Sequence, residues 1–205
     1  MNEIIQKPWD AIQKVLRSMD SESPRGLRDW KSHPHWNGKK DEPPITIDLA
    51  QRLFDVGIPA FAEVVYPNRK PGEEVQHCDV VVDLGATQYM WIEAKLLWTV
   101  WWTEDGERRD SSGSNAKRRI EDFLCDCKKK LFRLNRPYAT FIGGLAIAFE
   151  TPPKEVRTNL IEKVTSELSD WQIGQNSGNA ISSKTIHDVE CINRIWFWYR
   201  KVVND

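Results

Sequence analysis

Residues 138–149 form an apolar stretch that no charged residue interrupts (Tyr-Ala-Thr-Phe-Ile-Gly-Gly-Leu-Ala-Ile-Ala-Phe). A run of this kind is typical of a strand that is buried on both faces of a sheet. We therefore expect a central strand here, in a sheet that helices flank. The chain has 205 residues, 40% of them hydrophobic and 29% charged, which fits one globular domain.

Strand and helix patterns alternate along the rest of the chain. Alternation and β-branched or aromatic residues predict strands at 59–67, 77–84, 88–98 and 191–202. Apolar stripes predict helices at 7–19, 47–56 and 116–134, and a further helix that carries Val156, Leu160, Val164 and Leu168. This order predicts an α/β (α+β) fold with a mixed sheet flanked by helices. We expect residues 1–45 to form a helical and irregular N-terminal extension, and residues 46–205 to form the main domain.

Composition excludes several classes of protein. The formal net charge of -1 argues against binding of polyanions by bulk charge, although a local basic groove is compatible with it. No apolar run approaches the roughly 18 residues that a membrane-spanning helix needs, and no signal peptide is recognisable, so we expect a cytoplasmic protein without a membrane partner. The four cysteines lack the spacing of a zinc site and are expected to be free thiols.

On the predicted strands, three acidic residues and a lysine occupy positions that lie opposite one another or on the same face. If the second hairpin is centred on Ala86, Asp79 lies opposite Glu93, and Lys95 projects from the same face as Glu93. If the first hairpin is centred on Pro71, Glu63 lies opposite Asp79. The sequence thus predicts three carboxylates and one ammonium group on one patch.

Opposed carboxylates repel each other unless a cation lies between them. Mg²⁺, or Mn²⁺ in its place, prefers such oxygen ligands and activates water at phosphodiesters. A neighbouring lysine can position or deprotonate the attacking water. The small side chain of Ala94 would let its backbone oxygen approach the metal.

This arrangement resembles the PD-(D/E)XK family of restriction-endonuclease-like nucleases. The resemblance covers residues 46 to 150, and its motifs are Cys78-Asp79-Val80-Val81-Val82-Asp83 and Trp91-Ile92-Glu93-Ala94-Lys95, with Cys78 where the family name places proline. It implies a restriction-endonuclease-like sheet, metal ligation by Asp79, Glu93 and the Ala94 carbonyl, and a catalytic role for Lys95. It also implies an upstream acid, for which Glu63 and Asp48 are rivals. Asp126 and Lys130 resemble an acid-and-lysine pattern on the helix that follows in some members.

Basic and aromatic residues near this motif are candidates for nucleic-acid binding. The basic residues can contact phosphates; they are Lys117, Arg118, Arg119 and Lys130. The tryptophans, Trp98 and Trp101, can stack on bases or bury a dimer interface. The resemblance implies a metal-dependent phosphodiesterase, with DNA favoured over RNA, a homodimer as a compatible assembly, and a role in defence. The alternative is a catalytically inactive protein of the same fold that acts as a nucleic-acid-binding or assembly subunit.

Overall fold

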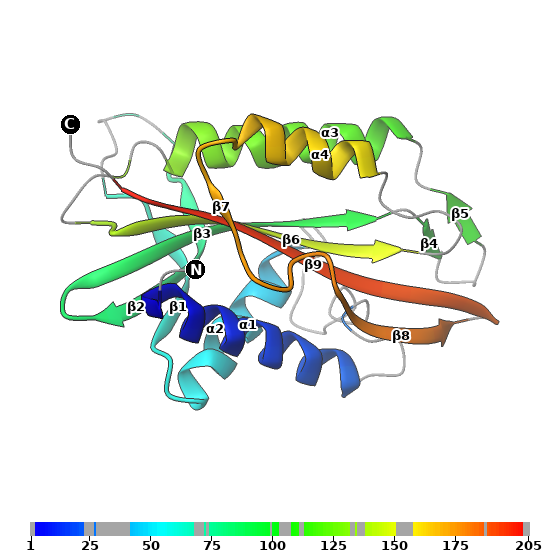
Figure 1. Ribbon diagram of the computed structural model, residues 1–205, viewed down its shortest axis with the longest axis horizontal. Helices are drawn as coiled ribbons and strands as arrows, with labels where there is room; N and C mark the ends of the chain where they lie inside the picture. The colour runs from blue at the N-terminus through cyan, green and yellow to red at the C-terminus, as the bar shows by residue number, and fades with distance from the viewer. Residues whose placement is uncertain are drawn as a thin grey trace.

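The computed structural model describes residues 3–22, 27, 42–67, 72, 74–98, 100–102, 108–110, 113–131, 134, 138–150, 158–186 and 188–202. Figure 1 shows three layers, with a sheet between α3 and α4 on one face and α1 and α2 on the other. The helices are α1 (Glu3–Ser21), α2 (Glu42–Asp55), α3 (Gly113–Cys125), the π-helical turn η2 (Asp126–Lys130) and α4 (Thr158–Glu167). The strands are β1 (Ala60–Val65), β2 (His77–Gly85), β3 (Gln88–Trp98), β4 (Val100–Trp102), β5 (Arg108–Asp110), β6 (Phe141–Glu150), β7 (Gln172–Ile173), β8 (Ala180–Ile186) and β9 (Val189–Lys201).

The main sheet has seven strands among the described residues, in the order β1-β2-β3-β6-β9-β7, with β8 also paired to β9. Strands β3 and β6 are parallel, and the other neighbours are antiparallel. Every residue of β6 is buried, because β3 and β9 flank it and helices cover both of its faces. The predictions of a mixed α/β sheet and of a doubly buried central strand are both confirmed.

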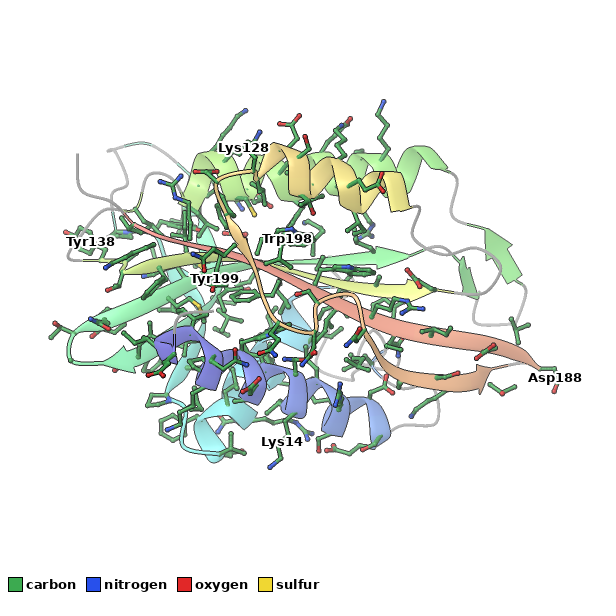
Figure 2. The ribbon with its side chains drawn as sticks, viewed as in Figure 1. Lys14, Lys128, Tyr138, Asp188, Trp198 and Tyr199 are labelled. Carbon is green, nitrogen blue, oxygen red and sulfur yellow. The ribbon has the colours of Figure 1, made fainter. Side chains whose placement is uncertain are left out.

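Two hydrophobic clusters lie on opposite faces of the sheet. Side chains of α1 and α2 pack with Val80, Ile92 and Leu145 on one face. Side chains of α3 and α4 pack with Trp91, Ile142 and Trp198 on the other. Figure 2 labels Lys128 on the layer of α3 and α4 and Lys14 on the layer of α1 and α2; both are exposed, as are the apolar side chains of Ile47 and Phe54 on α2.

Helix α1 packs on the sheet, and its buried side chains are part of the hydrophobic core. The Trp9 ring stacks on Phe197 at 5.0 Å between centroids. Its Nε1 donates to the backbone oxygen of Gln175 at 2.6 Å. Trp9 is fully buried, so the helix predicted within the N-terminal extension packs as an integral layer of the fold.

Several boundaries differ from the sequence-based expectation. Helix α2 begins at Glu42, before the expected 47–56, because prolines are tolerated in the first turn of a helix, where backbone N–H groups need no intrahelical acceptor. The helix expected at 116–134 begins at Gly113 and changes to a π-helical turn at Asp126. Strand β8 was not predicted, because its short polar sequence is ordered mainly by pairing with β9. Most of the irregular part expected within residues 1–45 lies outside the described residues, since 23–26 and 28–41 are not described.

Candidate functional site

The hairpin of β2 and β3 has the predicted register. Val80 pairs with Ile92 and Val81 with Trp91, which places Asp79 opposite Glu93 at the end of the ladder. Beyond the Val80–Ile92 pair, the Asp79 carboxylate accepts the backbone N–H of Ala94 at 2.6 Å. In an extended strand the N–H and C=O groups of one residue lie on the same edge. The Ala94 carbonyl therefore lies on the edge of β3 that faces β2.

Strand β1 also has the predicted register. Ala62 pairs with Val80 and Val64 with Cys78, so Glu63 lies opposite Asp79. Glu63 has a φ of 53°, which is uncommon for a residue with a Cβ atom. The chain turns over at this point: Ala62 packs with the α1 and α2 cluster, whereas Val64 packs with the α3 and α4 cluster. Backbone strain of this kind is found more often at functional sites than elsewhere.

This turn brings Tyr66 over Glu93. The Tyr66 hydroxyl donates to Glu93 Oε1 at 2.5 Å. The Tyr66 ring stacks on Trp91 at 5.5 Å between centroids. Nothing in the sequence spacing pointed to Tyr66, because its position depends on the twist of β1 beyond Glu63.

The π-helical turn η2 supplies a cation on the opposite side of Glu93. Lys130 Nζ lies 3.6 Å from Glu93 Oε2 and 2.9 Å from Asp126 Oδ1. The backbone N–H of Leu131 bonds to Asp126 O, five residues back, which defines the wide turn. Such turns occur frequently at functional sites. Lys130, predicted to bind nucleic acid, thus lies against the carboxylates together with Asp126.

A glycine on β6 permits this close approach of helix to sheet. Gly144 is the parallel neighbour of Glu93. A Cβ atom on Gly144 would lie 2.6 Å from Phe123 Cζ and 2.9 Å from Cys127 Sγ. Such distances are too short for real contacts, so only glycine lets α3 and η2 pack at this depth. The Gly143-Gly144 pair in an otherwise apolar strand was the sequence signal for it.

Burial makes the carboxylates of this cluster difficult to ionise. Glu93 is only 2% exposed, and its burial, together with the Asp79 charge, raises its pKa. Burial also raises the pKa of Asp79, with Glu63 adding to the increase. The Ala94 N–H, Lys95 and Lys130 act in the opposite direction on Asp79 but do not cancel the effect of burial. Burial therefore favours the protonated, neutral forms of these two acids in the metal-free protein.

Asp48, the other candidate for the upstream acid, forms an ion pair with Arg52. Its Oδ2 accepts Arg52 Nε at 2.9 Å on α2. Glu63, by contrast, is close enough to Asp79 to raise the pKa of that carboxyl. Of these two acids, Glu63 is therefore the one that lies beside Asp79.

The other predicted binding residues lie along α3 and the end of β3. Lys117 and Arg118 are exposed. Arg119 is turned toward the sheet, where its Nη1 donates to Leu96 O at 3.2 Å. Trp98 and Trp101 fall in β3 and β4, but their side chains lie outside the described part of the chain.

Within the described ranges, no three His, Cys, Asp or Glu side chains gather as a group that could hold a metal ion. The predicted ligand set is different in kind, since it combines two carboxylates, Asp79 and Glu93, with the Ala94 carbonyl. None of the described helices is both long and apolar enough to cross a membrane. Comparison with protein-family models, curated proteins and solved structures gave no match. The resemblance to PD-(D/E)XK nucleases stays a prediction.

Proposed function

We propose that this protein is a metal-dependent phosphodiesterase that cleaves DNA internally. One observation carries the proposal: Asp79 and Glu93 lie opposite each other and share a buried environment that raises the pKa of both. Two such carboxylates destabilise a sheet unless they serve another purpose. Binding of a divalent cation is the purpose that this arrangement fits best.

The residues present fit Mg²⁺ or Mn²⁺. Asp79, Glu93 and the Ala94 carbonyl offer hard oxygen ligands, and one or two carboxylates with retained waters are a usual set for Mg²⁺. Burial makes both carboxylates costly to ionise on their own, and a bound cation would favour their charged forms. A bound cation would supply charge neutralisation at the phosphodiester and make water a better nucleophile at neutral pH.

The residues of the chain would then perform the remaining tasks. Lys95 extends from the same strand as Glu93, and its charge acts on Asp79. In that position Lys95 would orient the attacking water, which adds to phosphorus while one P–O ester bond breaks. The products would be a phosphate monoester and an alcohol. Lys117 and Arg118, exposed on α3, would contact phosphates of the bound strand.

The direct test is cleavage of plasmid and single-stranded DNA with Mg²⁺ or Mn²⁺. The variants are Glu93→Gln and Lys95→Ala, and the control is Lys14→Ala, which removes an exposed cation from the opposite helical layer. We expect metal-dependent cleavage by wild type and Lys14→Ala, and a loss of at least about a hundredfold in both site variants.

Equal cleavage by all four proteins would identify a contaminating nuclease and contradict the proposal. Absence of cleavage by folded wild type on a broad substrate panel would favour the alternative, a non-catalytic protein that binds nucleic acid or serves as an assembly subunit. A DNA-binding measurement on the same preparation would then test that alternative directly.

A further inference from the structure

The two oxygens of Glu93 have different partners. Oε1 accepts the Tyr66 hydroxyl at 2.5 Å, and Oε2 lies 3.6 Å from Lys130 Nζ. An oxygen that already accepts a short hydrogen bond has one lone pair fewer to offer a cation than an oxygen that accepts none. The oxygen of Glu93 that remains for a cation is therefore Oε2, the one that Lys130 approaches.

Lys130 is held in this position by the fold of η2. Its side chain is 26% exposed, and its ammonium group contacts Asp126 Oδ1 at 2.9 Å within the same π-helical turn. The contact to Glu93 is longer than the contact to Asp126. An ammonium group with two acidic partners can give up the weaker one and keep the other. Lys130 can therefore leave Glu93 without becoming an unpaired buried charge.

We propose that Lys130 is an internal counter-ion of the carboxylate pair, which a divalent cation must displace from Glu93 in order to bind. The inference rests on the proposed metal site at Asp79 and Glu93. Lys130 stabilises the metal-free protein and, by competing for Oε2, lowers the affinity for metal. When a cation binds, the ammonium group moves off Glu93, remains with Asp126 and becomes available to a phosphate group of the substrate.

The competition can be measured without any activity assay. Mn²⁺ binding is followed by calorimetry and by the electron paramagnetic resonance signal of free Mn²⁺, for wild type, Lys130→Met and Lys130→Gln. Lys128→Met is the matched control, because Lys128 lies on the same turn, carries the same charge and pairs with Glu167 on α4. Circular dichroism and a thermal melt establish that each variant is folded.

We expect both Lys130 variants to bind Mn²⁺ at least about tenfold more tightly than wild type. Lys128→Met should change the affinity by less than about threefold. The two differ because a partly buried charge at short range acts on the metal site more strongly than an exposed, screened charge. Metal binding that appears only in the Lys130 variants would also support the inference. The same affinity in wild type and folded Lys130 variants would overturn it and leave the proposed function intact. No Mn²⁺ binding by any of the proteins would overturn both.

Discussion

Replacing Glu93 by glutamine should stabilise the metal-free protein at alkaline pH. Glu93 is 2% exposed, and burial followed by the Asp79 charge raises its pKa. The introduced amide would keep an acceptor for the Tyr66 hydroxyl and remove a buried charge, and Lys130 would retain Asp126 as a partner.

The direction of the pH dependence follows from linkage. An acid whose pKa is higher in the folded than in the unfolded protein binds its proton more tightly when folded, so stability falls as the pH rises between the two pKa values. Wild type should therefore lose stability as the pH rises from the ordinary carboxyl range through the raised pKa of Glu93. Glu93→Gln lacks this contribution and should show a weaker decline.

The size of the effect can be bounded from the burial of the pair. Each pKa unit of increase corresponds to about 1.4 kcal/mol. Burial and the Asp79 charge raise the pKa of Glu93 to about 8, so removing its charge should raise the free energy of unfolding at about pH 8.5 by on the order of 2 to 4 kcal/mol. For a chain of this size each kcal/mol shifts Tm by about 2–4 °C.

The assay is urea unfolding in the presence of a chelator at about pH 5 and about pH 8.5, read by circular dichroism. Glu150→Gln is the matched control: Glu150 is 1% exposed and accepts Arg194 Nε at 2.9 Å. Because removal of one partner from a buried ion pair costs about 3–5 kcal/mol, this variant should be less stable than wild type. A Glu93→Gln protein that is less stable than wild type at the alkaline pH, or equally sensitive to pH, would refute the reasoning.

Two further predictions test the packing and the binding surface. Gly144→Ala should lower the free energy of unfolding by about 1–3 kcal/mol, because its Cβ would lie 2.6 Å from Phe123; an unchanged Tm in a thermal melt would contradict the packing argument. The double variant Lys117→Ala/Arg118→Ala should bind duplex DNA more weakly than wild type. The magnitude of the slope of log K against log salt concentration should fall by about 1.8, the value expected for two lost phosphate contacts. An unchanged slope in a fluorescence-anisotropy titration would exclude these side chains from the interface.

The predicted strand register depended on local information. Side-chain alternation and the short connection at Gly85 predicted which residues of β2 and β3 face each other. In the structure Gly85 pairs with Gln88, and a register shift between Asp83 and Gly85 produces the predicted pairing of the remaining residues. With hairpin centres assumed at Ala86 and Pro71, Asp79 was expected opposite both Glu93 and Glu63, and the strand ladders agree with both pairings. Strand β6 could be predicted from the sequence equally well, because a strand that is buried at ten consecutive positions appears as an almost continuous apolar run.

Other parts of the structure left no comparable local pattern. Helix α1 is amphipathic in sequence, but its place in the core depends on contacts between Trp9 and residues far along the chain, Gln175 and Phe197. Helix α2 begins before the expected 47–56, because its two prolines lie in the first turn, where proline is compatible with a helix. Strand β8 forms on β9, and its own composition is weakly strand-like.

The sequence by itself determined the acid-x-lysine strand, the acid opposite it and the apolar strand beside it, because hairpin geometry and side-chain alternation act over a few residues. Only the tertiary structure decided what surrounds those acids. Tyr66 reaches Glu93 because β1 turns over at Glu63, and Lys130 reaches it because a π-helical turn packs against Gly144. These contacts depend on the twist of the sheet and on how deeply a helix settles on it, which are properties of packing between distant segments and have no signature of regular spacing.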